Sequence, residues 1–192
     1  MSNSAPPRAI PSRQNRGPAA AADNRRALIT AAREVYAEGG LGAPFSAVAK
    51  RAGVGQGSLY RHFPDRISLA VAVFEDNVRD LEEYTASYDR TVDDLLDRVV
   101  DQAVVSTAFI ELITADMSDP RVAGLGERFY RLVAGVVARD HAAGRVGTHI
   151  DTDDVTMATG MLATELARAD AAQRPAVATR ARALFHAAFA PR

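Results

Sequence analysis

Apolar residues recur every three or four positions along most of this chain, which is the spacing of one face of an α-helix. The first such stretch follows Asp23, a residue type that favours helix N-termini, and includes Leu28, Ala32 and Val35. No segment alternates convincingly between apolar and polar residues, so no β-sheet is expected. The pattern therefore predicts an all-α protein of about nine helices.

Glycines divide the beginning of this pattern into short helices. Gly39-Gly40 ends the first helix, because glycine readily takes the left-handed conformation that closes a helix. The stretch FSAVAKRA forms a second helix with Ser46 as its N-cap, and Gly53 ends it. A third short helix is predicted from about Gln56 to Phe63.

The rest of the chain reads as longer helices. Asp65 caps a long helix, and Thr91 or Asp93 opens another that extends to Phe109. After a break near SDP, a helix follows over GERFYRLVAGVVARDHAAG, and IDTDDV caps the penultimate one. Pro175 is suited to the first turn of the last helix.

Charge divides the chain more sharply than its net value of −1 suggests. Residues 1–66 hold ten Arg or Lys and four Asp or Glu, whereas residues 67–192 hold thirteen and twenty. A basic first third joined to an acidic remainder is typical of a protein whose first part binds a polyanion. Chance segregation of solvated charge is the alternative interpretation.

Composition excludes several classes of protein. The chain has 192 residues, 47% of them hydrophobic, and no cysteine, which excludes disulfides and thiolate metal sites and favours a reducing cytoplasm. No run of 18 apolar residues predicts a membrane span, and the N-terminus lacks the apolar core of a secretory signal. Residues 1–22 scatter Pro, Ser and Arg without an apolar period and are expected to form a disordered arm, whose arginines are available to DNA or simply solvated.

The stretch AGVGQGSLYRHFP, residues 52–64, carries the functional signal. A phosphate-binding loop would need a Lys before Ser58 and a preceding strand, and the spacing of these glycines is not that of a dinucleotide-binding loop. A helix-turn-helix fits better, because that motif joins two short helices by a tight turn that often contains glycine. Val54 is then expected to be the buried residue of the turn, and Gly57 permits close approach to DNA.

The third helix has two faces. Leu59 and Phe63 are four residues apart and should pack inward, whereas Gly57 and Arg61 lie on the opposite side. Arginine and glutamine side chains hydrogen-bond guanine and adenine, and tyrosine or histidine groups suit phosphate oxygens. The outer face is therefore a candidate reader of DNA bases.

The stretch FSAVAKRAGVGQGSLYRHFPDR closely resembles the helix-turn-helix of the TetR (or TetR/AcrR) family of bacterial transcriptional regulators, and the match covers about residues 24–75. The resemblance implies a helix-turn-helix domain over residues 23–66 and a helical effector-binding and dimerisation domain over residues 67–192. Two positions depart from the family pattern. Gly55-Gln56 replaces a common Ser-Lys pair, and Ile67 stands where an acidic residue is common.

The resemblance also implies which residues contact operator DNA. Those expected to face the bases are Gln56, Gly57, Ser58 and Arg61. Those expected to bind the sugar-phosphate backbone are Arg25, Ser46, Tyr60, His62 and Arg66. The alternative for each is a solvated surface residue.

The last two helices carry stripes of apolar and small residues. Their members are Met157, Gly160, Met161, Thr164 and Arg168 on the penultimate helix, and Ala181, Leu184, Phe185 and Ala188 on the last. From the pattern alone these stripes face either a partner or the subunit's own core. The resemblance implies a homodimer that joins two such helices from each subunit.

A small-molecule pocket among the middle helices is likewise implied by the resemblance. Its candidate lining residues are Phe74, Val78, Leu81, Tyr84, Phe109, Ile113, Phe129 and Tyr130. Aromatic residues would suit a hydrophobic or aromatic effector, although each of these side chains is equally a candidate for ordinary core.

Nothing in the sequence indicates catalysis. The four histidines are not paired at helical spacing, and no nucleophile elbow or paired carboxylates stand out, so no metal, cofactor or enzymatic activity is expected. The prediction is a DNA-binding repressor that a small molecule releases from its operator. The alternative is an effector-independent DNA-binding protein whose body only dimerises or binds a protein partner.

Overall fold

The computed structural model describes residues 18–116 and 118–191, which form nine α-helices and a short 3-10 helix without any β-strand in those ranges. The predicted all-α class is confirmed. Residues 1–17 of the predicted arm lie outside the described residues. Helix α1 runs from Pro18 to Gly39, so the predictions that residues 18–22 belong to a disordered arm and that Asp23 caps the helix were both wrong. Proline at the first helical position and the four alanines after it favour an earlier start.

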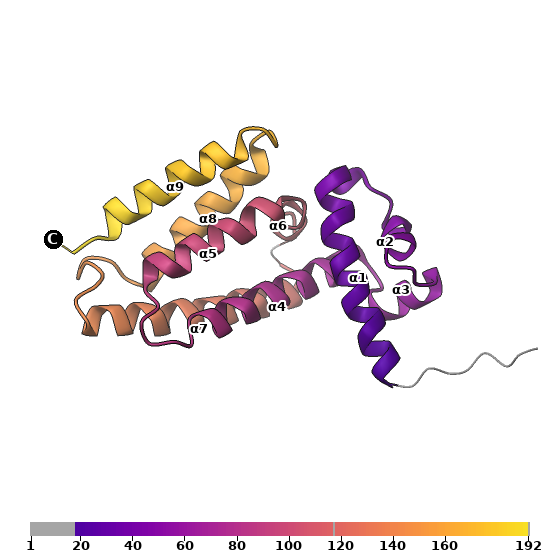
Figure 1. Ribbon diagram of the computed structural model, residues 1–192, viewed down its shortest axis with the longest axis horizontal. Helices are drawn as coiled ribbons and strands as arrows, with labels where there is room; N and C mark the ends of the chain where they lie inside the picture. The colour runs from indigo at the N-terminus through magenta and orange to yellow at the C-terminus, as the bar shows by residue number, and fades with distance from the viewer. Residues whose placement is uncertain (1–17, 117, 192) are drawn as a thin grey trace, which may run out of the picture.

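Three short elements complete a head around α1, at the right of Figure 1. They are the 3-10 helix η1 (Gly40–Gly42), α2 (Phe45–Arg51) and α3 (Gln56–His62). Gly40 has a φ of 56°, which confirms the predicted glycine stop after α1. Pro44 is the N-cap of α2, so Ser46 lies inside the first turn and does not cap the helix as predicted.

Helix α4 (Arg66–Tyr84) joins the head to the rest of the chain, the body, which comprises α4 to α9, and it packs against both α1 and α7. As predicted, Asp65 caps it, in a reciprocal pair with Ser68. The predicted helix from residue 91 to Phe109 is instead two helices, α5 (Val92–Val105) and α6 (Thr107–Thr114). The chain turns at Ser106, whose carbonyl accepts hydrogen bonds from the backbone N–H groups of Phe109 and Ile110 and so begins a new helix.

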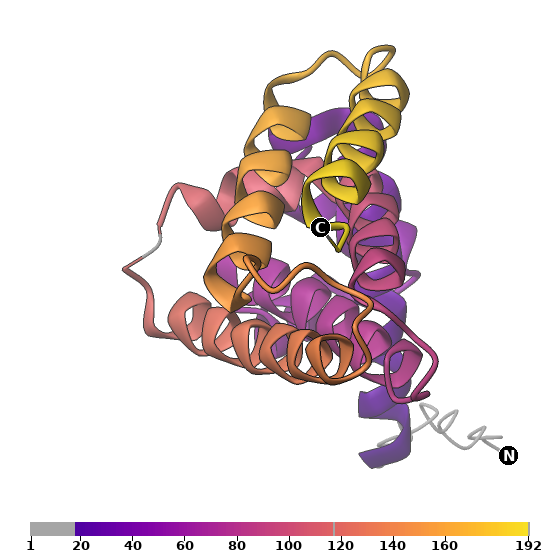
Figure 2. The same ribbon diagram turned by 90° about the vertical axis from the view of Figure 1, so that its left-hand side faces the viewer.

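The body is completed by α7 (Pro120–Ala142), α8 (Thr152–Arg168) and α9 (Arg174–Phe189). Helices α4 and α7 lie side by side, and α5, α8 and α9 stack over them (Figures 1 and 2). Asp151, within the stretch IDTDDV that was predicted to cap this helix, is its N-cap. None of the helices in the described ranges is both long and apolar enough to cross a membrane.

A buried carboxylate fastens α7 to the start of α5. Asp140 is 1% exposed and accepts hydrogen bonds from the backbone N–H of Val92 at 2.7 Å and from the Arg145 guanidinium at 2.7 and 2.9 Å. Because every one of these donors is satisfied by the same carboxylate, this contact fixes one end of the body.

Candidate DNA-binding surface and effector cavity

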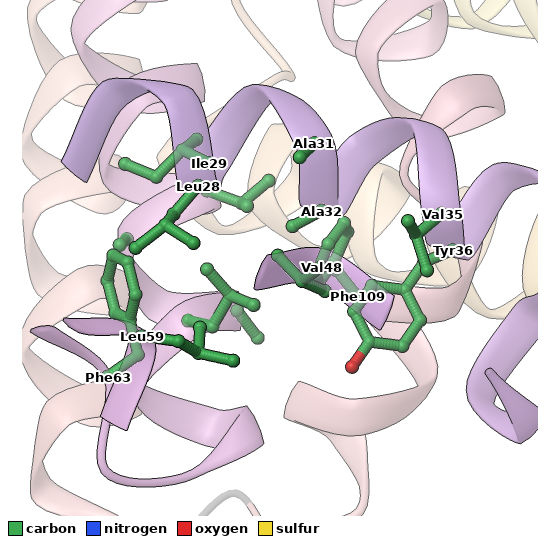
Figure 3. Close-up of a cluster of buried hydrophobic side chains, with 14 of the residues drawn as sticks. Leu28, Ile29, Ala31, Ala32, Val35, Tyr36, Val48, Leu59, Phe63 and Phe109 are labelled. Atoms are coloured by element: carbon green, nitrogen blue, oxygen red, sulfur yellow. The ribbon is translucent and has the colours of Figure 1, made fainter. Parts of the chain in front are cut away.

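Helix α3, the predicted DNA-reading helix, is held in place by its apolar face. Leu59 and Phe63 are buried against Leu28 and Val48, as Figure 3 shows. A helix of seven residues is not stable by itself in water, so this packing fixes both its existence and its orientation. The predicted inward face of α3 is confirmed.

The turn between α2 and α3 is closed by backbone hydrogen bonds. Gly53 has a φ of 66°, its N–H donates to the Lys50 carbonyl, and the N–H of Val54 donates to the Ala49 carbonyl. This pair of bonds is the Schellman motif, which requires the left-handed residue that glycine supplies. Val54 packs against the head core but is only half-buried, so the prediction that it is a buried residue was too strong.

The outer face of α3 is open to solvent. Gln56, Gly57 and Arg61 are exposed, and Tyr60 is 51% exposed. A methyl group added at Gly57 would meet nothing within 4 Å, so close approach to another molecule is unobstructed there. The ring of Tyr60 rests edge-on against Phe45 with centroids 5.5 Å apart, which orients a side chain that would otherwise be free.

The remaining predicted DNA contacts are partly engaged within the head. Ser46, Ser58 and His62 are half-buried. Arg25 lies 5.3 Å from the centroid of the Phe63 ring and 3.6 Å from the Glu75 carboxylate. Arg66 donates to the Ala43 carbonyl at 3.0 Å. These two arginines thus brace the head, and their phosphate contacts stay predictions.

Sequence reasoning missed the residue that joins α1 to α2. Arg51 donates to Glu34 at 3.0 Å and to both carboxylate oxygens of Glu38 at 2.7 and 3.1 Å. This hydrogen bonding lowers the pKa of Glu38. The bonds connect residues 13 and 17 positions apart, so no local pattern could have indicated them.

An apolar cavity of about 290 Å³ lies in the body between α4, α5, α6, α7 and α8. It is lined by Phe74, Asn77, Val78, Leu81, Val99, Gln102, Ala103, Ile110, Val122, Leu125, Gly126, Phe129, Thr156, Thr159, Gly160 and Ala163. The exposed members of this set are Gly126 of α7 and Gly160 of α8, which places the opening between those two helices.

Of the predicted pocket residues, Phe74, Val78, Leu81 and Phe129 line this cavity. Three others lie elsewhere. Tyr84 packs against the guanidinium of Arg90, Phe109 lies in the core of the head, and Tyr130 is 41% exposed on α7. The burial and neighbours of these side chains show where they lie, whereas the apolar spacing along the sequence does not distinguish core, cavity and surface. The side chain of Ile113 lies outside the described residues.

Sequence reasoning also missed the polar residues of the cavity wall. Asn77 is 5% exposed and lies between Val73 and Leu81 along the buried face of α4. A polar residue inside an apolar stripe is a signal that could have been noticed. Gln102, which faces it from α5, lies in a mixed segment and gave no such signal.

Helix α6 joins the cavity to the head with two adjacent residues. Phe109 packs edge-on against Tyr36 of α1 with ring centroids 5.1 Å apart (Figure 3). Ile110 lines the cavity. A movement of α6 would therefore displace both the cavity wall at Ile110 and the contact of Phe109 with Tyr36 in the head.

The predicted dimer residues divide between the outer surface and the subunit's own core. Met157, Met161 and Leu184 are 61%, 66% and 57% exposed. The other exposed members are Gly160, Thr164, Arg168 and Ala188. Ala181 and Phe185 instead pack against the clusters inside the body, because α9 turns that side toward α5 and α8.

In the part of the chain that the structure describes, no His, Asp and Glu side chains cluster as a metal site would require. Among curated proteins, none matches the chain significantly. Residues 28–73 match the model of the tetR family of bacterial regulatory proteins.

Several solved structures share the fold. A TetR transcriptional regulator from Streptomyces coelicolor is 24% identical, over 87% of this chain and 98% of that one, with a TM-score of 0.65. A TetR transcription regulatory protein from Mycobacterium vanbaalenii is 24% identical over 90% and 98%, with a TM-score of 0.61. The TetR family protein CprB from S. coelicolor A3(2) is 20% identical over 90% and 91%, with a TM-score of 0.60. Residues 28–73 therefore carry the DNA-binding motif of the tetR family of bacterial regulatory proteins, and the chain shares the fold of these solved structures over most of its length.

Proposed function

We propose that this protein is a repressor that binds operator DNA as a homodimer and is released by a small molecule. The observation that carries the proposal is the reading helix itself. Its apolar side is anchored by Leu59 and Phe63, while Gln56, Gly57 and Arg61 stand exposed on the other side. A rigid short helix with exposed hydrogen-bonding groups is suited to the major groove.

Roles within this surface follow from side-chain chemistry. Gln56, Gly57, Ser58 and Arg61 face the bases in the proposed complex, and Arg61 hydrogen-bonds guanine. Tyr60 and His62 bind phosphate, with Ser46 at the start of α2 beside them. Arg25 and Arg66 reach phosphate only by giving up part of their bracing contacts, so they contribute less.

The dimer forms through α8 and α9 in this proposal. Exposed methionines on α8 and Leu184 on α9 present an apolar surface that water disfavours. Gly160 lies between the two methionines and allows a second helix to approach closely. A dimer places two reading helices on one face of DNA when they are about 34–36 Å apart.

The cavity is the proposed effector site. Its lining is mostly apolar, which agrees with a hydrophobic effector. One solved structure with this fold is described as a gamma-butyrolactone receptor, which supports a small-molecule ligand without identifying it. A coupling of about 1–3 kcal/mol between effector and operator would give useful release. The alternative, an effector-independent DNA-binding protein, leaves this cavity without a role.

Binding to the promoter region upstream of the protein's own gene tests the proposal. The folded protein should bind this DNA specifically at moderate salt, as measured by gel shift and by fluorescence anisotropy. Tyr60→Ala should weaken binding to all sequences alike, whereas Arg61→Ala should relax preference at one base position. A folded dimer without a specific shift, or equal sequence-blind losses from both variants, would count against the proposal.

A further inference from the structure

The cavity wall contains an amide without a hydrogen-bond partner. Asn77 of α4 is 5% exposed, and in the described ranges no group hydrogen-bonds to its side-chain amide. Gln102 Nε2 donates to its backbone carbonyl at 3.1 Å, but not to its side chain. Because this amide has no partner within the described part of the protein, a ligand that hydrogen-bonds to it gains affinity there.

Gln102 extends this polar patch across to α5. Its Nε2 group donates both to the Asn77 carbonyl and to Asp80 Oδ2, at 3.1 and 2.9 Å. The amide NH₂ has only two hydrogens, so both are used, and its oxygen remains as an acceptor. Asn77 and Gln102 therefore form one polar strip in a lining that is otherwise aliphatic and aromatic, apart from two threonines.

Those threonines do not compete for a ligand. The hydroxyl of Thr156 donates to the Thr152 carbonyl at 2.8 Å, and that of Thr159 donates to the Thr156 carbonyl at 2.7 Å. Their hydrogens are used inside α8, so Asn77 is the group in the wall whose donors are free.

Among the residues that the structure describes, no ionisable side chain lines the cavity. The nearest charges border a second cleft that Asn77 and Gln102 also line. Arg98 donates to both oxygens of Asp80 at 2.9 Å, and Gln102 adds a third bond to the same carboxylate. A charged ligand in the cavity would find no counter-charge and would lose its hydration.

From these contacts we infer that the cavity takes a compact, uncharged, mainly apolar molecule with one hydrogen-bonding oxygen, and that Asn77 binds this oxygen. The inference rests on the proposed role of the cavity as the effector site and adds the chemical class of the effector. The cavity volume of about 290 Å³ limits its size, since a cavity of about 150 Å³ accepts benzene.

Three probes of similar shape test this class on the full-length protein by titration calorimetry. They are propiophenone, which has a ketone, propylbenzene, which has no polar group, and 3-phenylpropanoate, which is an anion. The ketone should bind about 2- to 13-fold more tightly than propylbenzene, the range of one net hydrogen bond. The anion should bind at least about tenfold more weakly than the ketone because its charge is unpaired.

Asn77→Leu assigns the preference to one side chain. It should remove the advantage of the ketone over propylbenzene while propylbenzene still binds. The matched control is Thr159→Val, which also alters a buried residue of the wall but should leave the advantage unchanged. The comparison of probes on the unaltered protein stands even if Asn77→Leu does not fold.

Each contrary result has a separate meaning. Anion binding as tight as ketone binding would overturn the uncharged class. Equal binding of ketone and hydrocarbon, or an unchanged advantage in Asn77→Leu, would overturn the role of Asn77. If none of the probes binds, the inference fails as a whole. Operator binding by the same samples is measured independently, so such a failure is distinct from failure of the proposed function.

Discussion

Two tyrosines of the head should respond to the same substitution in different ways, one in stability and the other in operator affinity. Tyr36 is 3% exposed, and its buried hydroxyl has no hydrogen-bond partner in the described ranges. Burial also raises its pKa, because the charged form would be poorly solvated. Its ring contributes the useful contacts, 5.1 Å from Phe109 and 6.0 Å from the Arg66 guanidinium.

Tyr36→Phe keeps those ring contacts and removes the unsatisfied hydroxyl. The free energy of unfolding should rise by about 1 kcal/mol or more, the lower end of the cost of a buried polar group without a partner. For a chain of this length, 1 kcal/mol corresponds to a melting temperature about 2–4 °C higher. Operator affinity should not change, because this residue lies inside the head, away from the outer face of α3.

Tyr60→Phe is the matched change on the outer face of α3. Because Tyr60 is 51% exposed, the unfolding free energy of the Tyr60→Phe protein should stay within about 0.5 kcal/mol of that of the unaltered protein. Operator affinity should fall at least about tenfold, since a hydroxyl bonded to phosphate is worth about 1.5 kcal/mol or more. Calorimetric melting and anisotropy titrations measure both quantities. A lower melting temperature for Tyr36→Phe, or unchanged operator affinity for Tyr60→Phe, would refute the respective assignment.

Three further substitutions test the framework that positions these sites. Asp140→Ala leaves the Arg145 guanidinium and the backbone N–H of Val92 without this acceptor, and should lower the free energy of unfolding in urea by about 3 kcal/mol or more. A loss below about 1 kcal/mol would contradict this role. Gly53→Ala places a side chain at a φ of 66° and should cost about 1 kcal/mol, with an unchanged melting temperature as the contrary result. Hydrogen bonding from Arg98 lowers the pKa of Asp80, so its stabilisation is complete above the unfolded pKa of about 3.9 and is lost as pH falls through the lower folded pKa. Asp80→Asn should therefore reduce stability at pH 7, and this loss should shrink as pH falls below about 3.9; a loss that does not change with pH would contradict the linkage.

Helix caps and ends are mostly predictable from the sequence because their causes are local, although Ser46 does not cap α2. Asp65, Thr91 and Asp151 cap their helices, and Gly53 closes α2, because each acts on backbone groups within a few residues. The error at Asp23 has the same local character, since an alanine run that extends a helix outweighed a good capping residue.

Positions set by distant contacts could not be read in this way. Phe109 is a pocket candidate on the resemblance, yet the turn at Ser106 directs it into the head. For Ala181 and Phe185 the pattern leaves open a partner or the subunit's own core, and packing of α9 on α5 turns them toward the core. Apolar residues at helical spacing occur in core, cavity and interface alike, so only the packing of the folded helices shows which of the three a residue belongs to.

The head and the cavity share packed residues rather than a flexible hinge. Phe74 lines the cavity and also packs against the head core, next to the buried Val73 of α4. The backbone carbonyl of Val73 accepts a hydrogen bond from Arg33 of α1 at 3.2 Å. A ligand that displaces the Phe74 side of the wall therefore acts on α1 through α4, while Ile110 carries the same displacement through α6. Close-packed cores pass between discrete arrangements instead of deforming gradually. On the proposed function, a wall movement of a fraction of an ångström is then enough to favour a different orientation of the reading helix.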